Sequence, residues 1–110
     1  MALPPLTAEQ RAAALDKAAA ARRTRAALKV QLKSHGASLQ DVLDSGATDE
    51  AIGKMKVLAV LEAMPGVGKI KAARMMDKLE ISPSRRVRGL GIKQREALER
   101  EFAERARRQR

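Results

Sequence analysis

The sequence predicts an all-α protein in which one long N-terminal helix is joined to a compact helical body. Strong helix formers continue without a glycine or proline from residue 7 to residue 35. After that point, prolines and glycines divide the rest of the 110 residues into short segments with helical spacing of their apolar residues. No segment alternates apolar and polar residues over the length of a strand. A chain of this size corresponds to one domain with an added arm.

The first helix is expected to run from about Thr7 to Ser34. Thr7 and Gln10 have the spacing of a capping box, and Gly36 supplies a stop signal. At 1.5 Å per residue this helix is roughly 40 Å long, which exceeds the radius of so small a body. Its large apolar residues gather at its C-terminal end, at Leu28, Val30 and Leu32. Residues 1–36 are therefore predicted to form an arm of which only the last third packs well.

Two helices are expected in the middle of the chain. Ser38 caps a short one that ends near Gly46, and Thr48 caps the next, which runs from Asp49 to Met64. Apolar residues cover more than one face of the longer helix, namely Ile52, Met55, Val57, Leu58, Val60 and Leu61. Such all-round apolarity predicts that this helix lies at the centre of the core.

The C-terminal half is expected to hold two more helices separated by a basic turn. The fourth helix continues to about Leu79. Its buried face is expected at Ile70, Ala73, Met76 and Leu79. The last helix runs from about Ile92 through Phe102. The helical body therefore spans residues 37–102, and residues 103–110 are predicted to be a basic tail that frays.

Positive charge is in excess and unevenly distributed. The chain has 23 Lys and Arg against 13 Asp and Glu, a net charge of +10, and a pI near 10.9. Residues 1–36 carry seven basic and two acidic side chains, residues 37–64 two and five, and residues 65–110 fourteen and six. Two basic regions thus flank an acidic one, a pattern that indicates a polyanionic partner.

Several function classes are excluded by residues that the sequence lacks. There is no cysteine and His35 is the only histidine, which excludes thiolate sites, multi-histidine metal sites and a cysteine nucleophile. Phe102 is the only aromatic residue, which argues against a pocket for a flipped base and against stacking on single strands. The longest aliphatic run, Val57 to Leu61, is far shorter than the ~20 residues of a membrane span, and the N-terminus lacks a secretory signal. We therefore expect a cytoplasmic protein that is not an enzyme, needs no cofactor or metal and has no membrane partner.

Residues 66–71 have the features of a phosphate-binding turn. Two glycines permit positive φ, and the first N–H groups of the following helix point outward without intrahelical acceptors. The helix dipole and two lysines add positive potential, so main-chain donors can hold a phosphate without reading a base. The candidate residues are Gly66, Val67, Gly68, Lys69, Ile70 and Lys71. The alternative interpretation is a tight helix–helix connection without a ligand.

Three further groups of residues are predicted to contact phosphates. A second turn supplies Ser84, Arg85, Arg86 and Arg88. The long helix carries seven cations against two acids, and its best candidates are Arg22, Arg23 and Arg25. Lys54, on the helix that leads into the glycine turn, is the last candidate. For each group the alternative is a solvated charged surface.

These motifs resemble known families. The stretch from Leu61 to Lys69, LEAMPGVGK, resembles a helix-hairpin-helix. Extended through residues 81–90, it is similar to the helix-two-turn-helix of a small-subunit ribosomal head protein and of some DNA-repair glycosylases. From Met1 to about Phe102 the chain resembles the actinobacterial integration host factors. The matches lie at residues 1–7, 9–15, 52–57 and 85–91.

The resemblance implies a helix-two-turn-helix body in a nucleoid-associated protein that binds double-stranded DNA with little sequence preference and bends or compacts it. It also implies a nucleoid location, a monomer in solution, and recombination or replication nucleoprotein complexes as partners. A ribosomal or structured-RNA-binding protein is the alternative, because it would use the same turn on phosphates; a helical adaptor for acidic proteins is a third class. The chain departs from the family pattern at residues 103–110 and at Thr24, Ala26 and Ala27.

Overall fold

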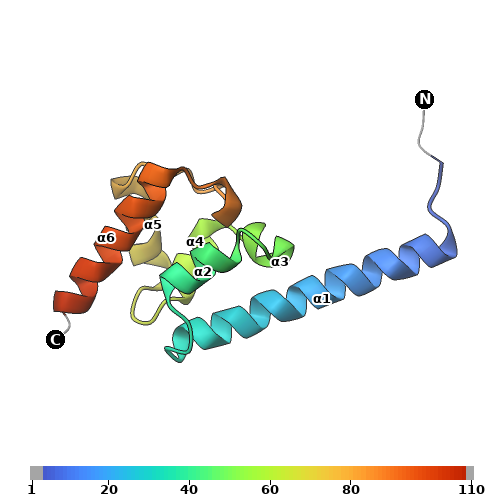
Figure 1. Cartoon of the computed structure of the whole chain (residues 1–110), viewed down its shortest axis with the longest axis horizontal. Helices are drawn as coiled ribbons and strands as arrows, with labels where there is room; N and C mark the ends of the chain where they lie inside the picture. The colour runs from blue at the N-terminus through green and yellow to red at the C-terminus, as the bar shows by residue number, and fades with distance from the viewer. Residues whose placement is uncertain (1–3, 109–110) are drawn as a thin grey trace.

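A computed structural model describes residues 4–108, so residues 1–3 of the predicted arm and residues 109–110 of the predicted tail lie outside the description. The helices are α1 (Ala8–Lys33), α2 (Leu39–Ser45), α3 (Glu50–Gly53), α4 (Val57–Ala63), α5 (Gly68–Lys78), a 3₁₀ turn η1 (Val87–Gly89) and α6 (Ile92–Arg108). Over residues 4–108 there is no strand, and the predicted all-α class is confirmed. Figure 1 shows α1 extending away from a body made by the other helices, which gives overall dimensions of 55 × 31 × 25 Å.

The predicted capping box starts α1. The Thr7 hydroxyl accepts the Gln10 N–H at 3.0 Å, and the Gln10 side-chain oxygen accepts the Thr7 N–H at 2.9 Å. At the other end His35, with φ of 64°, adopts the left-handed conformation, and the Gly36 N–H donates to the Gln31 carbonyl at 2.7 Å. The helix therefore ends in a Schellman motif in which histidine, rather than glycine, occupies the left-handed position.

Helix α1 contacts α3 and α4, and its fully buried residues lie near its C-terminal end. Leu28 and Leu32 are buried, whereas Leu15 is 68 % exposed. Val30, which was expected to pack with them, is 67 % exposed because its position lies on the opposite side of the helix from Leu28 and Leu32. The N-terminal part of the helix projects from the body, as Figure 1 shows, but contact with the body begins before the predicted last third. Ala21, Thr24 and Arg25 are already half-buried, and Lys17 pairs with Glu50 of α3.

The prediction of a single helix from Asp49 to Met64 is wrong. This region is divided into α3 and α4 by an extended segment at Lys56, which forms an isolated antiparallel bridge with Arg86. The Val57 N–H donates to the Arg85 carbonyl at 2.9 Å, and the Val87 N–H donates to the Met55 carbonyl at 2.8 Å. Tertiary hydrogen bonds to a segment thirty residues away therefore replace the helical bonds that local propensity favours.

Glycine at position 53 makes this arrangement possible. A Cβ atom there would lie 2.6 Å from the Gly46 carbonyl oxygen and 3.3 Å from Cβ of Arg88. Asp49, rather than the predicted Thr48, caps α3 by accepting the N–H groups of Ala51 and Ile52. The short α3 is thus held against the end of α2, and its Gly53 packs against the aliphatic part of the Arg88 side chain.

The buried face of α5 is shifted from the predicted one. Ala72, Met75 and Met76 are buried, whereas Ile70 is 71 % exposed and Ala73 is also exposed. Met76 and the half-buried Leu79 confirm part of the predicted face, whereas the rest of the face is shifted by about one residue, or about 100°, toward Ala72 and Met75. An isoleucine consequently lies in solvent at the start of α5.

The last helix does not end at Phe102. It continues to Arg108, and Arg105 is half-buried and bonded to the body. The expectation that the whole tail frays is therefore wrong for residues 103–108, and Arg110 lies outside the described residues. The division of the chain at residue 102 stays a prediction, although no helix boundary coincides with it.

One apolar core unites the helices of the body. Its fully buried members come from five helices and include Leu32 of α1, Val42 of α2, Leu61 of α4, Met76 of α5 and Leu98 of α6. Phe102 is half-buried against the same cluster. The predicted central position of the segment containing Val57 to Leu61 is confirmed by its burial. This core fixes the two turns described next.

Candidate nucleic-acid interface

The glycine turn has the backbone conformation that the sequence predicted. Gly66 and Gly68 have φ values of 72° and 68°, which side-chain-bearing residues rarely adopt. Val67 between them is buried, so it anchors the turn in the core, and its side chain is not available to a ligand. Gly68, Lys69 and Ile70 are exposed, and no side chain caps the N-terminus of α5 that they form. The free N–H groups and the helix dipole are thus presented to solvent.

Two cationic side chains share the carbonyl oxygen of Gly66. Lys71 Nζ donates to it at 3.4 Å, and Arg105 Nη2 donates to it at 2.9 Å. A carbonyl oxygen beside the N-terminus of α5 would repel an approaching anion, and these two donors offset its partial negative charge. Lys71 was a predicted site residue, whereas Arg105 was placed in the tail.

The second turn is held by its own arginines. The Arg85 N–H donates to the Ser82 carbonyl at 2.9 Å, and the Arg85 guanidinium donates to the Gly89 carbonyl at 3.1 Å. The Arg86 guanidinium donates to the Lys54 carbonyl. Ser84 and Arg88 are exposed. These contacts fix the loop, and the guanidinium N–H groups that they do not use remain available to an anion.

The two turns lie at opposite ends of α4. The glycine turn follows its C-terminus, and the arginine turn pairs with residues 55–57 at its N-terminus. Seven helical residues span about 10 Å. The two turns are therefore separated by about the length of this short helix.

Among the described residues, no hydrogen bond or ion pair joins the predicted cations of the arm to either turn. Arg22 and Arg23 are exposed, and Arg25 is half-buried. Within the described part of the chain, none of the three has a carboxylate partner. They belong to α1, whose axis leads away from the body (Figure 1).

Lys54 is engaged by an acidic residue. Its ammonium lies 2.6 Å from Glu50, and Lys17 lies 3.6 Å from the other oxygen of the same carboxylate. The hydrogen bond from Lys54, followed by the charge of Lys17, lowers the pKa of Glu50 below its ordinary value. The carboxylate is therefore ionised at neutral pH and offsets the charge of a predicted site residue.

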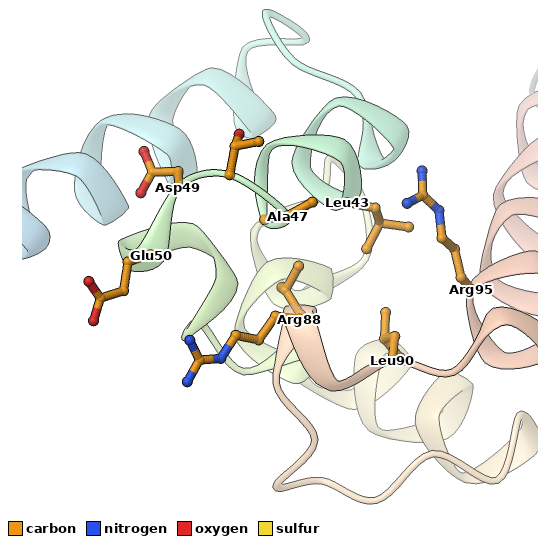
Figure 2. Close-up of a pocket in the computed structure, with 10 residues that line it drawn as sticks. Leu43, Ala47, Asp49, Glu50, Arg88, Leu90 and Arg95 are labelled. Carbon is orange, nitrogen blue, oxygen red and sulfur yellow. The ribbon is translucent and has the colours of Figure 1, made fainter.

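A hollow of about 450 Å³ lies between the α2–α3 connection, η1 and α6. Figure 2 shows Asp49 and Glu50 on one side of it, Arg88 projecting below them, and Arg95 extending from α6 on the far side. Arg95 is paired with Asp44 and Glu99. The mixed charge distinguishes this hollow from the basic turns, so we do not assign it to the interface.

Sequence reasoning missed a set of cations on α5 and α6. Arg74, Lys78, Arg105 and Arg108 line a second hollow together with the predicted residue Lys71. The signal was present, since residues 71, 74 and 78 recur at helical spacing on one face, as do 101, 105 and 108. The sequence alone does not show that these two faces meet, because their adjacency depends on how α6 packs beside α5 and on the helix continuing past Phe102 to Arg105.

Comparison with known proteins identifies the family. Residues 32–102 match the S13-like H2TH domain family. The integration host factor of Streptomyces coelicolor is 64 % identical over 102 residues, covering 93 % of this chain and 95 % of that protein. Those of Mycolicibacterium smegmatis and Mycobacterium tuberculosis are 63 % and 62 % identical, each covering 93 % of this chain and 97 % of theirs. The chain belongs to the integration host factor family.

A solved structure supports the same assignment. The chain is similar to sIHF bound to an 8-bp palindromic DNA, with a TM-score of 0.77 and 59 % identity, covering 79 % of this chain and 98 % of that one. The family resemblance and the helix-two-turn-helix fold of the body are therefore confirmed. Two absences can be stated for residues 4–108 of this integration host factor family member. No helix is long and apolar enough to span a membrane, and no cluster of three His, Asp or Glu residues could hold a metal ion.

Proposed function

We propose that the protein is a non-enzymatic, nucleoid-associated DNA-binding protein that holds duplex DNA by its phosphate backbone. The observation that carries the proposal is the glycine turn, where an uncapped helix N-terminus is flanked by Lys69 and Lys71. Such a terminus binds phosphate through main-chain donors. The name of its relatives and the DNA in the sIHF structure support double-stranded DNA as the partner and the cytoplasmic nucleoid as the location.

The proposed interface includes all the predicted site residues, with their roles adjusted to the contacts. Gly66, Val67 and Gly68 shape the turn, and Lys69, Ile70 and Lys71 begin the phosphate-binding helix. Ser84, Arg85, Arg86 and Arg88 form the second contact at the other end of α4. Arg22, Arg23 and Arg25 make a third contact along the arm, and Lys54 contributes once Glu50 releases it.

The arrangement suits a duplex that is bent or compacted. Two phosphate-binding turns on a rigid body fix one region of the backbone, while the cations of α1 extend the contact along a helix that leads away from the body (Figure 1). Contacts separated in this way favour DNA that curves toward both surfaces, because deformation is offset by the additional phosphate contacts. We propose that a monomer does this and serves recombination or replication complexes that need shaped DNA.

A titration with competing nucleic acids tests the proposal. Random-sequence duplex DNA, scrambled duplexes of equal length and structured ribosomal RNA fragments are compared at matched ionic strength. We expect duplex DNA to bind with little dependence on sequence, and log K to fall with log salt by about 0.9 per neutralised phosphate. Preferential binding to the RNA fragments would favour the structured-RNA alternative, and binding to neither would favour an adaptor for acidic proteins.

A further inference from the structure

The hollow between α5 and α6 concentrates positive charge. It has a volume of about 310 Å³, and its charged lining consists of Lys71, Arg74, Lys78, Arg105, Arg108 and a single carboxylate, Glu101. The Glu101 side chain is only 12 % exposed, whereas Lys78 and Arg108 are 62 % and 65 % exposed. The carboxylate therefore lies at the floor and the cations form the rim.

One carboxylate cannot offset five cations. Glu101 lies 2.9 Å from Lys78 and 4.0 Å from Arg108. Among residues 4–108 no carboxylate lies within ion-pair distance of Lys71, Arg74 or Arg105. Like charges gathered around one depression repel each other unless an anion enters. The net charge of this hollow thus favours a polyanionic ligand.

The hollow is continuous with the glycine turn. Lys71 and Arg105 both line it, and both donate to the Gly66 carbonyl. Arg105 uses one N–H group for that bond at 2.9 Å, which fixes the guanidinium plane while its remaining donors are free. A strand held at the N-terminus of α5 therefore has a cationic path along α5 and α6.

We propose that the α5–α6 hollow is a further phosphate-binding site, which receives the neighbouring phosphates of the strand held by the glycine turn. Arg74 contacts phosphate directly, and Arg105 joins the site to the turn. This inference deepens the proposed DNA binding and rests on it. It also gives α6 beyond Phe102 a role in affinity rather than only in long-range attraction.

Arg74→Gln tests the site, with Arg100→Gln as the matched control. Both side chains are exposed arginines, both variants lose one charge, and Arg100 lines none of the hollows described above. Affinity for a short random-sequence duplex is measured by fluorescence anisotropy at several salt concentrations. We expect Arg74→Gln to weaken binding about fivefold near 0.15 M salt and to reduce the salt slope by about 0.9, because one phosphate contact is lost. Arg100→Gln should change affinity by less than about twofold and leave the slope unchanged, because it loses only long-range attraction.

Amide chemical shifts supply a second, independent readout on the wild-type protein. Adding the duplex should shift the amides of residues 66–71 and also those of residues 74, 78, 105 and 108. Shifts confined to the glycine turn, or equal affinities of the two variants, would overturn the proposal that the α5–α6 hollow binds phosphate. The proposal would also be overturned if Arg74→Gln kept its affinity for one duplex but no longer bound a second duplex, because the hollow would then bind a different DNA molecule from the one on the glycine turn. A wild-type protein that binds no duplex would instead refute the proposed function itself.

Discussion

The arm and the arginine turn carry similar charges but use them differently. In the turn, the guanidinium groups of Arg85 and Arg86 each donate to a backbone carbonyl of the body. Along α1 the one ion pair found among the described residues is that of Lys17 with Glu50. The turn therefore commits part of its hydrogen-bonding capacity to its own fold, whereas the arm keeps nearly all its cations for an external partner.

This difference separates affinity from stability. Arg22 and Arg23 of the arm are exposed and only Arg25 is half-buried, so removal of the arm cations should disturb the packed core little. Arginines of the turn hold η1 against α3 and α4, so their removal affects folding and binding together. Net charge alone does not distinguish these cases, because it does not record which donors are already satisfied.

The largest effect on binding is expected from replacing Arg22, Arg23 and Arg25 together by glutamine. If each contacts one phosphate, the salt slope should fall by about 2.7 and affinity by about a hundredfold near 0.15 M salt. The melting temperature should fall only slightly, because none of the three has a carboxylate partner in the described structure and Arg25 alone is half-buried. Anisotropy titrations and thermal melts check both parts.

A charge-matched triple variant serves as the control. Lys93, Arg100 and Arg107 are exposed on α6, and replacing them by glutamine removes the same three charges. We expect a much smaller loss of affinity from this protein at physiological salt. Equal losses in the two triple variants would mean that net charge, rather than the position of the arm, determines binding.

Arg86→Ala is expected to have the next largest effect and to change two quantities at once. Loss of its phosphate contact should cost on the order of 1–3 kcal/mol in binding, uniformly across DNA sequences, and lower the salt slope by about one. Loss of its bond to the Lys54 carbonyl should also lower the free energy of unfolding by about 1 kcal/mol. Titration and chemical denaturation separate the two. Arg86→Lys should recover the charge but not the fixed geometry, so affinity restored in full by lysine would contradict a positioned contact.

Local signals were sufficient to predict α1, α2 and the glycine turn. The Thr7 and Ser38 capping boxes fix two helix starts through bonds between residues three apart, and the two glycines of the turn fix its positive φ values. Such features depend on neighbours in the sequence. They are therefore readable before the tertiary structure is known.

Features that depend on distant partners were not predictable in the same way. The break between α3 and α4 exists because Lys56 and Arg86 pair across thirty residues, and the buried face of α5 depends on the direction from which α4 packs. The bond from Arg105 to Gly66 likewise joins residues 39 apart. Each of these tertiary contacts overrides or supplements a local preference, and together they account for the missed part of the candidate site.

Glu50→Gln should produce the smallest effect, and it should be a gain. The carboxylate holds Lys54 at 2.6 Å and Lys17 at 3.6 Å, and its lowered pKa keeps it charged at neutral pH. Neutralising it releases two cations between the arm and the body, so affinity for duplex DNA should rise about threefold, with a steeper salt dependence if Lys54 then meets a phosphate.

The control for this gain is Glu96→Gln, which removes the same charge from an exposed position on α6 with no cation partner in residues 4–108. If only general repulsion between carboxylates and phosphates were relieved, the two variants would gain equally at low salt and not at all at high salt. A larger gain in Glu50→Gln that persists at higher salt would instead reflect freed Lys54 and Lys17. Unchanged affinity in Glu50→Gln would place Lys54 outside the interface and restrict phosphate binding to the two turns, the α5–α6 hollow and the outer part of the arm.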